Sequence, residues 1–186
     1  MKDKIILASA SPRRRELLSL ITTEFEVITA DVDETIDADE TAENTVMTLS
    51  AKKAKAVASL YPERIVIGAD TIVVCDGKIL GKPVSRENAK EMLMMLSGRT
   101  HQVLTGVTIT DTEKTETFYV SSDVTFFSLT DDEISVYVES GETDDKAGSY
   151  GIQGKGSLLV EKINGDYFNI VGLPVSTLNK KLEKFI

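Results

Sequence analysis

The 186-residue sequence predicts an α/β fold in which helices flank a mixed, twisted sheet and two lobes enclose a cleft. Strand-like and helical segments alternate in the N-terminal half, which is typical of parallel βαβ units. Farther along, two long alternating segments follow one another directly, which indicates antiparallel strands. Because no internal repeat or linker interrupts the chain, we expect residues 1–186 to form a single domain.

The first strand and the first helix are expected to meet at a polar turn. Residues 4–9 have the apolar pattern of a buried strand. Ser11 is the expected N-cap of the following helix, and Pro12 suits its first helical position. The apolar stripe of this helix is expected to contain Leu17, Leu18 and Ile21.

The other elements follow from periodicity, capping residues and turn residues. We expect a strand at 25–28, a helix at 42–61, strands at 64–68, 71–75 and 78–80, a helix at 85–98, strands at 103–109 and 117–127, a helix at 131–141, strands at 157–162 and after 165, and a helix from 174. Asp-Gly at 76–77 predicts a tight hairpin.

Acidic side chains outnumber basic ones, 30 to 21, and give a net charge of −9. Nucleic acids and anionic membranes attract basic surfaces, so we expect neither as a partner. The sequence contains no apolar run long enough for a membrane span or for the core of a signal peptide. Its single cysteine, Cys75, excludes a disulfide within the chain. We therefore expect a cytoplasmic protein.

Residues 9–15, Ser-Ala-Ser-Pro-Arg-Arg-Arg, form a candidate phosphate site. A strand that turns into a helix leaves backbone N–H groups and the positive end of the helix dipole facing one place. Arginines in that first turn oppose the dipole and cost stability unless an anion binds. We expect Ser9, Ser11, Arg13 and Arg14 to contact phosphate, and the alternative is a solvated basic turn.

Asp70 lies between two strongly apolar β segments, so we expect it at a strand end or partly buried. A buried carboxylate needs a hydrogen bond, a counter-ion or a metal. Asp33 and Glu34 are expected at the end of another strand, from which they could bring a second carboxylate to the same metal. Magnesium bound with a triphosphate commonly uses one or two carboxylates. The alternative for Asp33 and Glu34 is a solvated acidic loop.

Two lysines and one glutamine complete the candidate site. Lys53 lies within the apolar stripe of the expected helix at 42–61, so it either snorkels or reaches into a cleft. Lys82 stands between a glycine and a proline, and the alternative is an ordinary turn lysine. Gln153 lies in a glycine-rich segment, where its amide could donate to and accept from a base edge. His101 is interpreted as a structural strand residue.

A rival hypothesis comes from residues 31–35, which fit the D-x-D-x-T pattern of haloacid-dehalogenase-type phosphatases. Those enzymes attack with the first aspartate, here Asp31, and form a phospho-enzyme. The preceding strand is short and alternating, whereas a strand in the middle of a doubly wound sheet is continuously apolar. This difference argues against the phosphatase hypothesis, which we keep as an alternative.

The motifs of the chain stand in this order: Ser-x-Ser-Pro-Arg-Arg-x-Glu-Leu-Leu at 9–18, Gly-Ala-Asp-Thr at 68–71, Gly-Lys-Pro at 81–83, Leu-Ser-Gly at 96–98, Thr-Gly-Val at 105–107, Asp-Lys-Ala-Gly-x-Tyr-Gly-Ile-Gln-Gly at 145–154 and Val-Gly-Leu-Pro at 171–174. This ordered set resembles the Maf family of nucleotide pyrophosphatases over essentially the whole chain. Leu-Ile-Thr at 20–22 departs from the family's usual Leu-Gly and affects only the shape of that turn.

The resemblance implies a fold related to the inosine triphosphate pyrophosphatases, a deep cleft and a homodimer. It implies hydrolysis between the α- and β-phosphates with a divalent cation, Mg²⁺ or Mn²⁺. By matching motifs, Asp70 would be the general base or the metal-held activator of water, and Glu34 would be a ligand of metal or water. The phosphates would be held by Arg13, Arg14, Lys53 and Lys82.

The resemblance also suggests a substrate. Arg13, Thr71 and Gln153 are similar to the branch that acts on dTTP and UTP. The alternative branch acts on 7-methyl-GTP and resembles a pattern with an aromatic residue, a glutamine and an acid at or near these positions. The family is also linked to arrest of septum formation and to removal of modified nucleotides. A non-catalytic nucleotide sensor that binds division proteins is therefore a further alternative.

Overall fold

The computed structural model describes residues 5–35 and 40–186, and the chain forms two compact units. Unit 1 consists of residues 1–71, 105–120 and 172–186, and unit 2 consists of residues 72–104 and 121–171. Each unit is therefore assembled from segments that are far apart in the sequence. The expectation of a single domain over 1–186, and of a cleft between lobes, stays a prediction.

Unit 1 is built on a largely parallel arrangement of strands. Strand β1 is parallel to both β2 and β3, with Leu7 opposite Val27 on one side and Ile67 on the other. Its strands stand in the order β2-β1-β3-β5-β6. Their bounds, with those of the helices in this unit, are β1 (Ile5–Ala8), α1 (Pro12–Leu18), β2 (Phe25–Val27), α2 (Ala42–Ala58), β3 (Val66–Cys75), β5 (Thr100–Thr110), β6 (Thr115–Phe126) and α6 (Val175–Leu182). Strands β3, β5 and β6 continue into unit 2.

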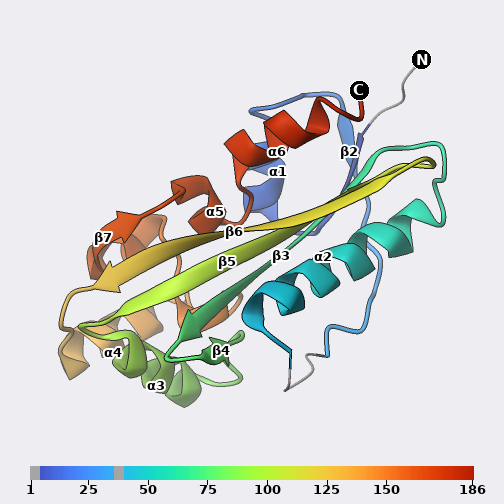
Figure 1. Cartoon of the computed structure of the whole chain (residues 1–186). Helices are drawn as coiled ribbons and strands as arrows, with labels where there is room; N and C mark the ends of the chain where they lie inside the picture. Colours follow the sequence, from blue (N-terminus) through green and yellow to red (C-terminus); the bar gives the residue numbers. More distant parts are fainter. Residues whose placement is uncertain (1–4, 36–39) are drawn as a thin grey trace. The chain divides into compact units, whose positions relative to one another are not determined.

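Helix α2 packs on β3 and β5 at two glycines. A Cβ atom added to Gly68 would lie 2.4 Å from the carbonyl oxygen of Ser50, and one added to Gly106 would lie 2.2 Å from that of Val46. Any larger residue would push the helix backbone away from the strands. Helices α1 and α6 lie on the opposite side of these strands from α2 (Figure 1). The glycines therefore set how closely α2 approaches the sheet.

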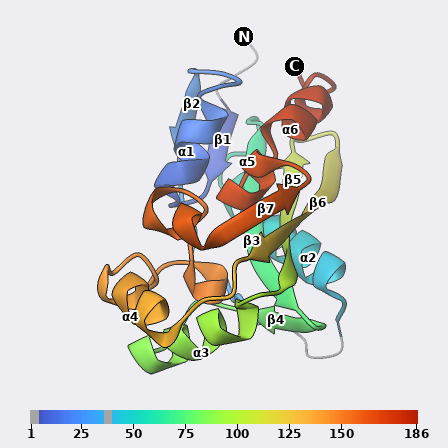
Figure 2. The same ribbon diagram turned by 90° about the vertical axis from the view of Figure 1, so that its left-hand side faces the viewer.

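Unit 2 contains the antiparallel part of the chain. Strand β4 pairs with β3 through the expected Asp-Gly hairpin, and β7 pairs with β6. Helices α3 and α4 lie side by side (Figure 2). The elements of this unit are β4 (Lys78–Leu80), α3 (Arg86–Leu96), α4 (Asp131–Glu139), the short 3₁₀ turns η1 (Ala147–Ser149) and η2 (Gly154–Leu159), β7 (Val160–Asn164) and α5 (Tyr167–Val171).

The predicted mixed sheet flanked by helices is confirmed, and so are several element ends. Ser11 caps α1, with Pro12 as the first helical residue, and Ser85 and Thr130 cap α3 and α4. Ile21 lies beyond the end of α1, which stops at Leu18. No helix in the described ranges combines the length and the apolar character that crossing a bilayer requires.

In the C-terminal third, one strand prediction is wrong and another is confirmed with a later start. The strand expected after residue 165 is the helix α5, because Asp166 accepts a hydrogen bond from the backbone N–H of Phe168 at 2.8 Å. Buried Asn169 also needs partners, and on the helix its amide reaches the Val103 carbonyl and the Ser122 hydroxyl, each at 2.9 Å. The strand expected from 157 begins only at Val160, after the turn η2.

Candidate active site

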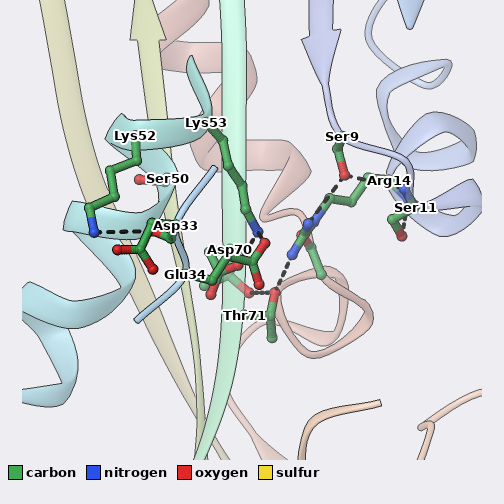
Figure 3. A network of polar contacts seen from close by, with 12 residues as sticks. Ser9, Ser11, Arg14, Asp33, Glu34, Ser50, Lys52, Lys53, Asp70 and Thr71 are labelled. Carbon is green, nitrogen blue, oxygen red and sulfur yellow. Dashed lines mark hydrogen bonds and ion pairs between the residues drawn. The ribbon is translucent and has the colours of Figure 1, made fainter. Parts of the chain in front are cut away.

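Arg14 is held by three hydrogen bonds from different parts of unit 1. Its Nε donates to the Gly172 carbonyl at 2.8 Å, Nη1 to the Ser9 hydroxyl at 3.2 Å and Nη2 to the Thr71 hydroxyl at 2.9 Å. Figure 3 shows the guanidinium directed toward Ser9 and Thr71. A guanidinium has five N–H donors, so these bonds fix its orientation and use only part of its capacity.

Burial lowers the pKa of Arg14, and the nearby positive charge of Arg13 lowers it further, whereas Asp70 and Glu34 act in the opposite direction. Arginine nevertheless stays protonated in proteins, so burying this charge lowers the stability of the folded protein. A buried cation held in one orientation is a prepared receptor for an anion.

The two serines of the N-terminal turn are both engaged with Arg14 and its backbone. Ser9 is buried and accepts from Arg14 Nη1 and, at 3.3 Å, from the backbone N–H of Ser11. The Ser11 hydroxyl accepts from the backbone N–H of Arg14 at 3.4 Å, as expected of the N-cap. A hydroxyl that accepts can still donate its own hydrogen, so both serines remain able to bind phosphate.

Lys53, Asp70 and Glu34 meet at one point of unit 1. The Nζ atom of Lys53 lies 2.5 Å from Oδ1 of Asp70 and 2.9 Å from Oε1 of Glu34. Figure 3 shows Lys53 reaching from α2 to Asp70 on β3. The exposed fractions of the side chains are 16% for Lys53, 13% for Asp70 and 55% for Glu34. The helical prediction that Lys53 faces inward is confirmed.

The structure confirms one part of the expectations about the carboxylates and corrects the other parts. Asp70 lies inside β3 and not at a strand end, because 64–68 and 71–75 belong to one continuous strand that begins at Val66. Its partly buried position agrees with the other half of that expectation. Asp33 and Glu34 do not end a strand, since β2 stops at Val27 and both residues are exposed beyond it.

Asp33 takes part in a local turn. Its Oδ1 accepts from the Thr35 hydroxyl at 2.5 Å and from the Thr35 backbone N–H at 2.9 Å, and these bonds lower the pKa of Asp33. Lys52 donates to the Asp33 carbonyl at 3.2 Å. The turn and Lys52 thus support the residue preceding Glu34, and Glu34 is the carboxylate of the pair that reaches Lys53.

Thr71 uses its hydroxyl within this network. The Oγ1 atom receives the bond from Arg14 and lies 2.9 Å from Oγ1 of Thr105, which is completely buried. Sequence reasoning placed Thr105 and Gly172 in motifs without giving either a role. The motifs that contain Thr105 and Gly172 are short. Nothing in them indicates that they lie beside Arg14, which is far away in the sequence.

The other two candidates, Lys82 and Gln153, belong to unit 2. Lys82 is exposed in the turn after β4, and the preceding Gly81 carbonyl accepts from the backbone N–H of Gly148 at 3.1 Å. Gln153 is exposed at the N-terminal end of η2. One backbone hydrogen bond therefore joins the Lys82 turn to the glycine-rich segment that leads to Gln153.

His101 has the buried position expected of a structural strand residue. It lies on β5, and its Nε2 is 2.7 Å from the Tyr150 hydroxyl. Its ring meets those of Phe126 and Tyr150 edge-on. Burial lowers the pKa of His101 to about 4, so the imidazole is neutral at pH 7.

The donor chemistry of unit 1 fits a divalent cation that is bound together with a substrate. In the described ranges, no cluster of three or more His, Cys, Asp or Glu side chains could hold a metal by itself. Asp70 and Glu34 do meet at a common positive group, the Lys53 ammonium. Magnesium commonly takes one or two carboxylates and completes its shell with phosphate oxygens and water.

Comparison with known proteins identifies close relatives over almost the whole chain. A family model described as Maf-like protein matches residues 4–185. A protein from Bacillus mycoides (strain KBAB4) is 55% identical over 98% of this chain and 95% of its own length, and it is named dTTP/UTP pyrophosphatase. A Bacillus cytotoxicus protein with the same name is 54% identical over the same shares.

Solved structures support the fold. A HAM1 protein from Coxiella burnetii aligns with 98% of this chain and 99% of its own, with a TM-score of 0.54 and 14% identity. The Ham1 protein of Staphylococcus aureus aligns with 67% of this chain and 72% of its own, with a TM-score of 0.50 and 19% identity. The expected relation to the inosine triphosphate pyrophosphatase-like fold is confirmed.

Proposed function

Because this chain belongs to the Maf-like protein family, we propose that it hydrolyses dTTP and UTP to the nucleoside monophosphate and pyrophosphate. Relatives at 54–55% identity that carry the name dTTP/UTP pyrophosphatase support this activity. The structural observation that carries the proposal is the meeting of Asp70 and Glu34 at Lys53, in the same unit as the fixed guanidinium of Arg14.

Asp70 is the residue that we assign to activate water. In the reaction, the water oxygen forms a bond to the α-phosphorus. The bond from this phosphorus to the oxygen that it shares with the β-phosphate breaks, and pyrophosphate leaves. The water must lose a proton, and a carboxylate within hydrogen-bond reach can accept it. Lys53 compensates the charge of Asp70 and holds its carboxylate in place at 2.5 Å.

Cations and hydroxyls would hold the phosphates. Charge that develops on the leaving pyrophosphate is best stabilised by groups that are oriented beforehand. Arg14 meets that condition because its three bonds fix it before a substrate arrives. We propose that the residues that contact the phosphates are Ser9, Ser11, Arg13, Arg14, Lys53 and Lys82.

We further propose that Asp70 and Glu34 hold a Mg²⁺ or Mn²⁺ ion together with the substrate. Such an ion, when bound, polarises phosphate oxygens and lowers the pKa of a water ligand. The chain's own contribution is to bring the two carboxylates together and to balance them with Lys53 until the substrate arrives.

Substrate choice is assigned to Arg13, Thr71 and Gln153. The uracil and thymine edge contains carbonyl acceptors and an imide donor, and an amide side chain matches both. Thr71 donates or accepts within the Arg14 network, so its influence on the substrate would pass through Arg14. The names of the relatives favour the pyrimidine branch over the 7-methyl-GTP branch.

The phosphatase alternative, the homodimer and the cytoplasmic location are proposals. The phosphatase alternative requires Asp31 as nucleophile, but Asp31 is exposed and lies beyond the end of β2. A homodimer and a cytoplasmic location stay part of the proposal, and they follow from the family and from the composition. Binding of division proteins is a further alternative, which predicts nucleotide binding without turnover.

A substrate panel with product chromatography tests the function. Purified protein is incubated with dTTP, UTP or 7-methyl-GTP, in the presence of Mg²⁺, Mn²⁺ or a chelator. We expect monophosphate and pyrophosphate in equal amounts from dTTP and UTP, and little product with the chelator. Release of orthophosphate alone, or an aspartyl-phosphate at Asp31, would contradict the proposal.

A further inference from the structure

The segment 150–155, called the Gln153 loop below, carries an exposed glutamine between two short 3₁₀ turns. A glutamine side chain has three rotatable bonds, and a loose backbone would add to its freedom. A flexible amide at that place would discriminate poorly between bases, because recognition depends on holding donor and acceptor in position. The contacts that hold the loop therefore bear on the selectivity of the site.

Helix α4 and the turn that follows it hold the loop on both sides of Gln153. Two residues before it, the backbone N–H of Gly151 donates to the Tyr137 hydroxyl at 3.1 Å. Two residues after it, the backbone N–H of Lys155 donates to Oε1 of Glu142 at 3.3 Å. Tyr137 lies on α4 and Glu142 lies in the turn that follows it, so the helix anchors one flank and the turn anchors the other.

Tyr137 is built into the protein as a fixed acceptor. Its side chain is buried, and this burial raises the pKa of the phenol to about 12, so it stays neutral at working pH. A Cβ atom added to Gly156 would lie 2.9 Å from this hydroxyl and 1.9 Å from the Gly151 carbonyl oxygen. Only glycine therefore lets the chain return this closely to the anchored residue.

A second buried group holds the start of the loop. The Tyr150 hydroxyl lies 2.7 Å from Nε2 of His101, and the Tyr150 ring packs edge-on against Phe126 with centroids 4.7 Å apart. Tyr150 is 5% exposed. Anchors at residues 150, 151 and 155 thus leave Gln153 on a short exposed stretch between them.

We propose that Tyr137 and Glu142 are positioning residues that hold Gln153 for recognition of the pyrimidine base, an inference that rests on the proposed function. Neither residue is assigned a contact with the substrate. Their action passes through the backbone of the Gln153 loop. Their loss should therefore weaken base discrimination and raise KM, while the chemical step, which is assigned to Asp70, continues.

The test compares UTP with CTP, which differ only at one edge of the base. Tyr137→Phe removes the hydroxyl and keeps the ring. We expect it to lower the ratio of kcat/KM for UTP over CTP by about fivefold, the value of one ordinary hydrogen bond, with kcat for UTP changed by less than about twofold. Tyr119→Phe, at an exposed tyrosine on β6 outside unit 2, is the matched control.

Glu142 offers an independent variant pair. Glu142→Ala removes the acceptor for the Lys155 N–H and should reduce the same ratio, whereas Glu142→Gln keeps an acceptor oxygen and should restore most of it. The double variant Tyr137→Phe with Gln153→Ala should have the same ratio of kcat/KM for UTP over CTP as Gln153→Ala alone. If Tyr137 acts only through Gln153, its loss has no further effect once Gln153 is gone. Additive losses would contradict the proposal, and so would an equal loss for UTP and CTP.

Amide hydrogen exchange separates this inference from the proposed function, because it needs no turnover. Tyr137→Phe should speed exchange at residues 150–155, and Glu142→Ala should speed it at Lys155. Unchanged exchange would overturn the positioning role even if the enzyme is active. A wild-type protein that shows the protected loop but no pyrophosphate release would contradict the proposed function alone.

Discussion

Lys53 Nζ lies 2.5 Å from Oδ1 of Asp70, and the same ammonium lies 2.9 Å from Oε1 of Glu34. One cation thus serves two carboxylates that come from a strand and from an irregular segment. Two carboxylates that share a site repel one another, and the ammonium between them offsets that repulsion.

Replacement of Asp70 by Asn should abolish most turnover. The change keeps the shape of the side chain but removes the charge and the basicity, and a positioned general base contributes roughly 10²- to 10⁴-fold. Pyrophosphate release from dTTP measures the loss. Asp33→Asn is the control, since its carboxylate serves the turn at Thr35. If Asp70→Asn kept about a tenth of the wild-type rate, the assignment as base would be wrong.

The neighbouring lysines of α2 provide a matched pair. Lys53→Met keeps the apolar stem but leaves Asp70 and Glu34 without their common counter-ion, so kcat/KM should fall by about 100-fold or more. Lys52→Met removes only a bond to the Asp33 carbonyl and should lower kcat/KM by less than about threefold. Steady-state kinetics with UTP compares the two. Similar losses in both variants would show that general charge, and not the site, explains the effect.

Thr71 should act through Arg14. Thr71→Val removes the acceptor of the Arg14 Nη2 bond and leaves the guanidinium held by Ser9 and Gly172. We expect KM for dTTP to rise by about tenfold to 100-fold, because losing a hydrogen bond to a charged group costs about 1.5–3 kcal/mol. Thr71→Ser keeps the hydroxyl and should behave like the wild type. An unchanged KM in Thr71→Val would separate Thr71 from phosphate binding.

The local pattern of the sequence predicts part of this site and misses the rest for identifiable reasons. Helical periodicity places Lys53 on the inward face of α2, since side-chain direction follows from position along a helix. That Lys53 meets Asp70 depends on how closely α2 approaches β3. This approach is set by a glycine whose role is visible only in three dimensions.

Long-range partners and conflicting propensities account for the errors. Arg14 bonds to the carbonyl of Gly172, 158 residues away in the sequence, and no periodicity indicates such a contact. The β-type residues at 167–171 predict a strand by composition. The hydrogen-bonding needs of Asp166 and buried Asn169 select a helix there instead.

Gly68→Ala tests the close approach of α2. The added Cβ would lie 2.4 Å from the Ser50 carbonyl oxygen, which belongs to the helix backbone and cannot rotate away. Overpacking of this kind costs about 1–3 kcal/mol, and urea unfolding should show it. Gly81→Ala is the control, because a Cβ at Gly81 meets nothing within 4 Å. Equal stability of the two variants would contradict the packing argument.

His101 should make stability depend on pH between about 6.5 and 4. Burial holds its pKa near 4 in the folded protein, whereas the unfolded chain titrates near the ordinary value of 6.5. Since the unfolded state takes up the proton first, the contribution of neutral His101 is complete above pH 6.5 and is lost as the pH falls toward 4. The full loss corresponds to roughly 3 kcal/mol, at about 1.4 kcal/mol per pH unit.

His101→Phe isolates this term from the carboxylates, which titrate in both proteins. The phenylalanine fits beside Phe126 and Tyr150 but cannot take up a proton, although it loses the bond to the Tyr150 hydroxyl. Urea unfolding at pH 7, 6 and 5 should show the wild type losing more stability than the variant as the pH falls. Parallel curves for the two proteins would mean that His101 is not held neutral by burial, since burial disfavours only the charged form.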